Sequence, residues 1–244
     1  MKTRRSDHPR RRVDARGKVV ISRAPLHEQV AEEIRRMIVT GRLAPGEKIK
    51  VSELAEELDV SLTPMREALK ILGKESLVDL IANRGARVSE ITVDGTRSLF
   101  EVISRLEALA AELAARRITG AELQELEDLH RQMIESHQAN DLQAYFDLNL
   151  EIHNLVVDAA KNSDLTRTRT SLAFHVERAR FVSVATRGHR DLSVQDHDNL
   201  MQALRDRDPD RARDVWQAHL ERAGNEACRL VALWEAETDQ AAAQ

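Results

Sequence analysis

The chain has 244 residues and a net charge of −4, with 42% hydrophobic and 32% charged residues, nine Gly, five Pro and one Cys. So few turn-forming residues argue against an all-β protein, and a single cysteine excludes an internal disulfide. No apolar run approaches the ~20 residues of a membrane span or follows the N-terminal arginines as in a signal peptide, so we expect a cytoplasmic protein without membrane contact.

The charge is unevenly distributed along the chain. Residues 1–24 carry nine basic and two acidic groups, residues 25–92 carry ten and twelve, and residues 93–244 carry 18 and 27. This division indicates an N-terminal part that binds a polyanion and a C-terminal part that does not. Residues 1–24 show no periodicity, so we expect a basic flexible arm there, either simply solvated or in contact with DNA phosphates.

Three helices are expected in the first third of the chain. Helical spacing of apolar residues begins at Leu26, and Gly41 should end that helix. A second, short helix is expected from about Val51. The third should begin at Thr63-Pro64, because threonine caps helices and proline is tolerated in the first helical position.

A β-hairpin is expected to follow these helices. Two short apolar runs, residues 77–81 and 86–88, flank a turn in which Gly85 is available for a positive φ. Three helices and a hairpin within residues 25–90 predict a winged helix-turn-helix domain.

The third helix has the features of a DNA-reading helix. Arg66 and Lys70 lie along its outer side, and an arginine in the first turn can bond guanine in a major groove. Ser61 and Thr63 at the helix start can contact phosphates or bases, and Arg84 at the hairpin tip can enter the minor groove. The alternative is that these groups are merely solvated.

From residue 94 onward the apolar pattern is helical throughout. Short connections predict antiparallel neighbours in a bundle of six to seven helices, so the fold is mostly α. We expect this domain to span residues 94–236, with a flexible tail at 237–244. The expected helices cover residues 94–117, 120–139, 141–160, 164–186, 192–206 and 209–235.

Histidines in this bundle are spaced as in a metal site. His197 and His219 are equidistant from residue 208, at a turn between two helices, so they should stand at the same height. They form half of a metal site. His153 lies four residues after Asn149 on a largely apolar helix and is a third candidate. Most isolated histidines are surface or satisfied core residues, so a bundle without a metal is the alternative.

The N-terminal part resembles the winged-helix domain of the GntR family of bacterial transcription regulators. The matching stretches read I-x-x-G-x-L-x-P-G from residue 38 and S-x-T-P-x-R-E-A-L over residues 61–69. The resemblance implies that Ser61, Thr63, Arg66 and the hairpin around Arg84-Gly85 contact the operator. The family usually has arginine where this chain has Leu62, so one phosphate or base contact is missing.

The C-terminal part resembles the helical effector domain of the FadR subgroup, the FCD domain. The resembling runs are NLEIHNLVVDAAKNSDL from Asn149 and QDHDNLMQALRDRDPDRARDVWQAHLE from residue 195. The resemblance implies a divalent metal held by Asn149, His153, His197 and His219. The first of these is more often aspartate, and the neutral set suits zinc, with nickel or manganese as alternatives.

The subgroup's first helix usually carries an arginine that binds the carboxylate of the effector. That position falls on Ile103 here, and Arg105 lies on a different face. Arg178 or Arg180 can replace it, and His175 should stand level with His153. We therefore assign effector binding to His175, Arg178 and Arg105.

These features together predict a ligand-responsive repressor rather than an enzyme. It should bind a palindromic double-stranded DNA operator as a homodimer and respond to a small organic acid. One alternative is a metal-independent regulator that binds an acyl or other apolar ligand. Another is a helical metalloenzyme, for which the nearest general base, Glu151, lies on the wrong face.

Overall fold

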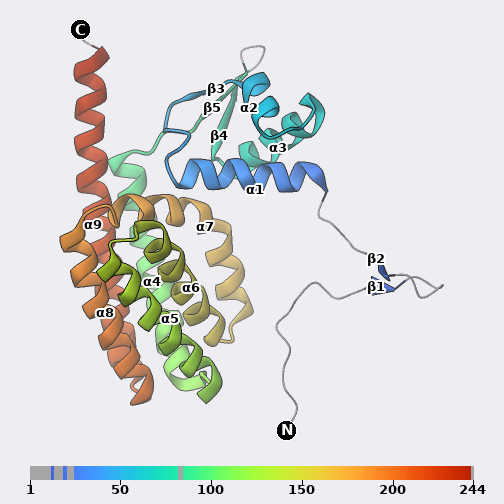
Figure 1. Cartoon of the computed structure of the whole chain (residues 1–244). Helices are drawn as coiled ribbons and strands as arrows, with labels where there is room; N and C mark the ends of the chain where they lie inside the picture. Colours follow the sequence, from blue (N-terminus) through green and yellow to red (C-terminus); the bar gives the residue numbers. More distant parts are fainter. Residues whose placement is uncertain (1–11, 14–18, 21–24, 82–84, 243–244) are drawn as a thin grey trace. The chain divides into compact units, whose positions relative to one another are not determined.

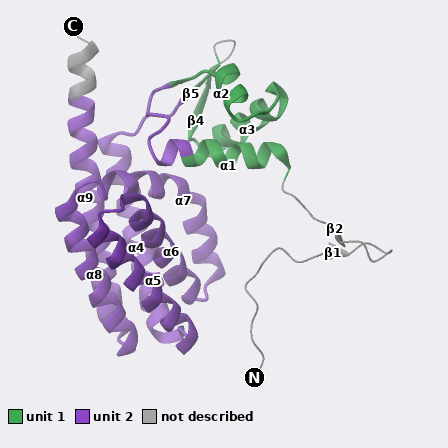
Figure 2. Ribbon diagram, viewed as in Figure 1, with its two compact units in different colours: residues 1–36, 48–87 green, residues 37–47, 88–244 purple. Residues whose placement is uncertain are grey.

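The computed structural model describes residues 12–13, 19–20, 25–81 and 85–242 (Figure 1). The chain divides into two compact units, residues 1–36 with 48–87 and residues 37–47 with 88–244 (Figure 2). Within the expected arm, strands β1 (Arg12–Val13) and β2 (Val19–Val20) form an antiparallel pair. The rest of that arm lies outside the described residues.

The N-terminal elements form the expected winged helix-turn-helix. They are α1 (Leu26–Val39), β3 (Lys48–Ile49), α2 (Val51–Glu57), α3 (Leu62–Lys74), β4 (Val78–Ile81) and β5 (Gly85–Val88). The strand order is β3-β5-β4, and β3 pairs antiparallel with β5. Strand β3 was not expected, because two residues are too few to show an alternating pattern.

The core of the winged helix is apolar and closed. Ile34, Met65, Leu72 and Leu77 are each fully buried. The half-buried Glu75, just after α3, accepts hydrogen bonds of 2.8 to 3.0 Å from the buried Arg35 of α1. These contacts hold α1 against the end of α3 and leave the opposite side of α3 in solvent.

Helix α3 begins earlier than expected. Its N-cap is Ser61, in extended conformation, so Thr63 is already the second helical residue. Pro64 is tolerated there because the N–H groups of a first helical turn have no intrahelical acceptor. The Ser61 side chain makes no capping hydrogen bond.

The C-terminal part is a bundle of six helices within the described residues, as expected. They are α4 (Val93–Arg117), α5 (Gly120–Ala139), α6 (Leu142–Ala159), α7 (Ser163–Ser183), α8 (Arg187–Arg205) and α9 (Pro209–Ala242) (Figure 1). Several begin at capping side chains. Thr119 forms a capping box with Glu122, and Asp141 and Asn162 accept from the first N–H groups of α6 and α7.

Two helix boundaries differ from expectation. Helix α8 starts at Arg187, so Gly188 lies in its first turn rather than in a break. Helix α9 continues to Ala242, into the segment expected as a flexible tail at residues 237–244. The physical reason is that residues 236–242 contain neither proline nor glycine to end the helix.

The bundle closes around large buried side chains, among them Tyr145, Leu200 and Trp216. Helix α9 packs along α4 and α8. At Gly224 of α9, an added Cβ would lie 2.6 Å from the ring of Phe100, so only glycine permits this approach of α4. No helix in the described part of the chain combines the length and apolar character of a membrane span.

Candidate functional site

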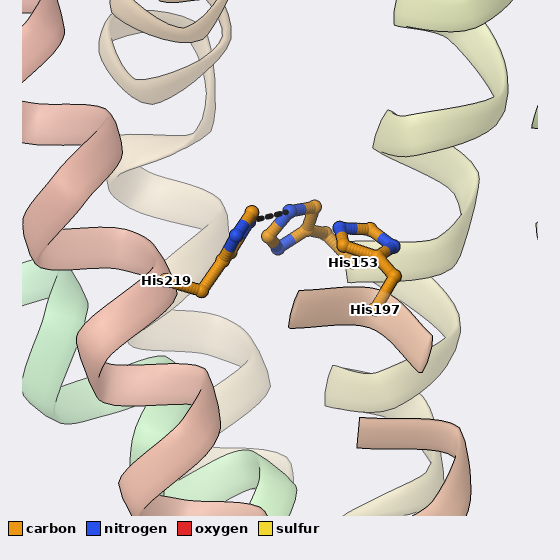
Figure 3. Close-up of side chains that lie close together, drawn as sticks. All are labelled: His153, His197 and His219. Atoms are coloured by element: carbon orange, nitrogen blue, oxygen red, sulfur yellow. Dashed lines mark hydrogen bonds between the residues drawn. The ribbon is translucent and has the colours of Figure 1, made fainter. Parts of the chain in front are cut away.

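Three histidine side chains meet inside the bundle (Figure 3). His153 comes from α6, His197 from α8 and His219 from α9, and their candidate ligand nitrogens all lie within 4.8 Å of one another. Their exposed fractions are 0%, 0% and 4%. The structure thus brings together the three imidazoles that the spacing singled out, and we call them the histidine site.

Two of these imidazoles are oriented by carboxylates. The Nδ1 atom of His153 lies 2.6 Å from Glu107 Oε2, and the Nδ1 atom of His219 lies 3.3 Å from Asp196 Oδ2. An ionised carboxylate only accepts, so each Nδ1 carries the proton and each Nε2 presents a lone pair. Such outer carboxylates accompany metal-bound histidines.

The two Nε2 atoms then face each other without a proton between them. They lie 3.4 Å apart in the contact drawn in Figure 3. Two nitrogens about 2.0–2.1 Å from one tetrahedrally coordinated zinc ion are about 3.4 Å apart. The spacing of this pair therefore fits a cation between the rings.

Further polar atoms at or near the histidine site lack partners. Both ring nitrogens of His197 are buried without a hydrogen bond in the described part of the chain, and so is Oδ1 of Asn149. Asn149 lies one helical turn before His153 on α6 and is 3% exposed. Buried acceptors without partners are costly, so the residues present fit a bound metal ion.

Burial keeps the three imidazoles neutral. It lowers the pKa of His153 and His197 well below the usual value, with further contributions from Arg180 and from His219, respectively. Burial also lowers the pKa of His219, although Asp196 opposes this shift. Neutral imidazoles are the form that coordinates metals, so no proton has to leave at neutral pH.

Trp216 of α9 forms one wall of the histidine site. Its ring centroid lies 4.6 Å from that of His219, in a stacked arrangement, and 4.4 Å from that of His153. The centroid of His197 lies 4.9 Å away, edge to face. This contact with all three rings restricts their rotation, and it makes Trp216 a local reporter.

A buried charge cluster adjoins His153. Glu107 Oε1 accepts from Arg180 at 2.7 Å and from Arg169 at 3.3 Å, and all three side chains are at most 6% exposed. Although burial acts to raise it, the pKa of Glu107 is held well below its usual range by Arg180, His153 and Arg169. One N–H group of each arginine has no partner within the described residues.

Glu107, Arg169, Asp196 and the position of Trp216 were not predicted from the sequence. For Glu107 the sequence does contain one indication. This charged residue follows the apolar Ile103 by one helical turn, so it lies on the buried face of the helix.

Of the three expected effector residues, His175 and Arg178 line a cavity and Arg105 is exposed. Arg178 donates to the carbonyl oxygen of Ser89 at 2.9 Å. The exposed Arg105 lies 3.5 Å from Glu221. Arg180, the alternative to Arg178, belongs to the charge cluster instead. The reason is that side chains two residues apart on a helix point in directions that differ by about 200°.

The expected DNA-reading residues lie on one exposed part of the winged helix. Ser61, Thr63, Arg66 and Lys70 are exposed, and Lys70 forms an ion pair of 2.7 Å with the neighbouring Glu67. Gly85 is exposed and has a φ of 97°, which only glycine adopts readily. Arg84 lies outside the described residues.

Comparisons with known proteins match both parts of the chain. Residues 26–88 match the gntR family of bacterial regulatory proteins, and residues 98–222 match the FCD domain. The HTH-type transcriptional repressor RspR of Escherichia coli is 29% identical over 160 residues, which are 65% of this chain and 70% of that protein.

Two further similarities extend this result. An uncharacterised HTH-type transcriptional regulator of Bacillus subtilis is 30% identical over 145 residues, 58% of this chain. The match spans 63% of that relative, less than two thirds of its length. Among solved structures, E. coli McbR/YncC superimposes with a TM-score of 0.73 at 20% identity, covering 82% of this chain and 95% of the other. This last similarity shows a shared fold.

Proposed function

The chain belongs to the GntR family of bacterial regulatory proteins with an FCD domain, and we propose that it is a metal-dependent, ligand-responsive repressor. Its relatives are DNA-binding transcriptional regulators, and RspR is named a repressor. The observation that carries the metal-dependent part is the meeting of three buried imidazoles from three helices.

In this proposal the exposed side of α3 reads the operator. Arg66 contacts base edges in the major groove, Lys70 and the hydroxyls of Ser61 and Thr63 contact phosphates or bases, and the turn of Arg84 and Gly85 reaches the adjacent groove. Palindromic half-sites are bound by two-fold symmetric proteins, so the chain acts as a homodimer on DNA in the cytoplasm.

FCD domains often bind metals, and the histidine site suits a divalent one. We assign His153, His197 and His219 as ligands through nitrogen and Asn149 as a ligand through its amide oxygen. Three imidazoles favour zinc, with nickel or manganese as alternatives. When bound, the ion supplies a fixed positive charge that can accept an anionic ligand.

The charge cluster favours an acidic effector. Arg169 and Arg180 both form ion pairs with one buried carboxylate, Glu107, and each keeps a terminal nitrogen without a partner within the described residues. Residues 93–244 as a whole carry an excess of acidic groups, 27 against 18 basic. Local positive charge is thus needed to bind a small organic acid. We propose that such an acid alters operator affinity.

The same cluster argues against a hydrolytic enzyme. A general base needs a pKa near neutrality, but the pKa of Glu107 is held far below that despite its burial. The other acidic residue considered, Glu151, is exposed and on another face of α6 than His153.

Elemental analysis of protein purified without a metal-affinity tag tests the metal proposal. We expect one zinc, nickel or manganese ion per chain, and quenching of Trp216 fluorescence when nickel is added to EDTA-treated protein. A Trp234→Phe variant isolates the Trp216 emission, since the chain has two tryptophans.

A second measurement tests the effector. Small carboxylates should raise the melting temperature of the metal-loaded protein and change its affinity for an operator selected from random DNA. A protein that contains no metal and takes up none would instead support a regulator with an acyl or other apolar ligand.

A further inference from the structure

The cavity lined by Arg178 and His175 lies where the segment between β5 and α4 meets α7. Its volume is about 390 Å³, within the range of small-molecule sites. Among its lining residues are Ile91, Thr96, Leu99, Leu172, His175 and Arg178, and none belongs to the histidine site. We call it the linker cavity.

The linker cavity holds a buried cation, Arg178, and its lining includes one exposed carboxylate, Glu90, whose charge acts on that cation. Arg178 is 5% exposed, and no ion pair to it occurs within the described residues. One terminal nitrogen donates to Ser89 O at 2.9 Å, and the other, Nη2, is buried with no partner there. Burial lowers the pKa of Arg178 to about 10, so the guanidinium stays protonated at neutral pH. The charge of Glu90 opposes this shift, but Nη2 still lacks a hydrogen-bond acceptor, and a buried nitrogen of this kind favours an anionic partner.

The remaining walls combine apolar surface with several polar groups, among them Thr96, Ser98 and the exposed Glu90. The hydroxyl of Thr96 is buried without a hydrogen bond in the described part of the chain. Ile91, Leu99 and Leu172 supply apolar contacts, while the exposed Ser98 also lines the cavity and leaves a route from solvent. A ligand that matches these walls has an acidic head and a short apolar body.

We propose that the linker cavity binds a small monocarboxylate, about the size of benzoate or hexanoate, whose carboxylate accepts hydrogen bonds from Arg178 and Thr96. This site is separate from the effector site proposed beside the histidines and needs no metal. The linker cavity lies between α7 and the segment that leads from the winged helix into α4. A ligand there therefore acts on the connection between the two parts of the chain.

Calorimetric titration of the EDTA-treated full-length protein with benzoate tests this proposal. We expect saturable binding of benzoate and of hexanoate, and at least about tenfold weaker binding of the neutral benzamide. Working without metal removes the histidine site from the measurement.

Matched variants locate the site. Arg178→Gln should weaken benzoate binding at least about tenfold, because it removes a charge-assisted hydrogen bond. Arg167→Gln, which changes an exposed arginine on the same helix, should leave the affinity unchanged. If Arg178→Gln does not fold, Thr96→Val retains the shape of the site and should weaken binding a few-fold.

Three results would overturn the proposal. They are no binding of either acid to the metal-free protein, equal binding of benzamide, and unchanged affinity in the folded Arg178→Gln variant. Binding that appears only with metal and disappears in His197→Ala would place the acid at the histidine site instead. A protein without metal affinity that still binds benzoate would refute the metal proposal and leave this one standing.

Discussion

The winged helix and the bundle place the side chains that we propose as functional in opposite environments. Ser61, Arg66 and Lys70 lie in solvent on a closed apolar core that does not depend on them. His197 and Asn149 are buried inside their own core and lack partners within the described residues.

This difference in burial means that changes to the two sets of side chains should affect protein stability differently. A surface that reads DNA can be changed without loss of stability, because its groups are hydrated in the free protein. A buried polar site is costly when it is empty and contributes to stability when it is filled. The following changes test this contrast, from the largest expected effect to the smallest.

Removal of the central carboxylate should have the largest effect. Glu107→Ala leaves Arg169 and Arg180 buried without a counter-charge, so we expect the free energy of unfolding to fall by about 3–5 kcal/mol. Urea denaturation followed by circular dichroism measures it. The matched control on the same helix is Glu112→Ala, which removes a partly exposed i,i+4 pair with Arg116 and should cost under about 1 kcal/mol.

Loss of the metal should destabilise the bundle next. In His197→Ala with His219→Ala, metal content and melting temperature should decrease together. At metal concentrations of 100 to 1,000 times Kd, the lost binding corresponds to about 3–4 kcal/mol. Plasma mass spectrometry and calorimetry measure the two quantities, with His27→Ala in the other unit as control. Retention of one ion per chain in the double variant would contradict the assignment of these ligands.

Arg66→Ala should affect DNA binding and leave stability unchanged. We expect operator affinity to decrease by about 1–3 kcal/mol per recognition helix, because a bidentate contact to guanine is lost. Gel-shift assays measure the affinity, and thermal unfolding should change little because Arg66 is exposed. If Arg66→Ala binds the operator as the parent does, α3 is not the reading helix.

The smallest expected change restores an absent contact. Leu62 is 40% exposed at the start of α3. Leu62→Arg should add one phosphate contact and steepen the dependence of log affinity on log salt concentration by about 0.9. Leu62→Gln, which is polar but uncharged, is the control and should keep the parental slope.

The sequence predicted those features that depend on local pattern. The helical spacing of apolar residues and the short breaks between them predicted the six helices, and equal distances from a turn predicted that His197 and His219 meet. The charge cluster of Glu107, Arg169 and Arg180 was not predictable in this way. Its members lie up to 73 residues apart, and no periodicity relates one arginine on α7 to one glutamate on α4.

The start of α3 was predicted two residues too late because more than one residue there can cap a helix. Thr63 and Ser61 are both capping residues, and the proline at position 64 is allowed in any position of the first turn. The side chains on α7 were not distinguished from one another for a different reason. Its pattern is weakly amphipathic, so Arg178 and Arg180 were equally plausible at the histidine site from sequence alone.

Helix α7 carries two guanidiniums, two residues apart, that face different surroundings. Arg178 holds the carbonyl group of Ser89, while Arg180 holds Glu107, which in turn orients His153. Because these side chains project in nearly opposite directions, a rotation of α7 about its own axis moves them oppositely. One rotation of α7 would therefore shift the contact with Ser89 at the start of the bundle and the contact with Glu107 in its interior in opposite directions.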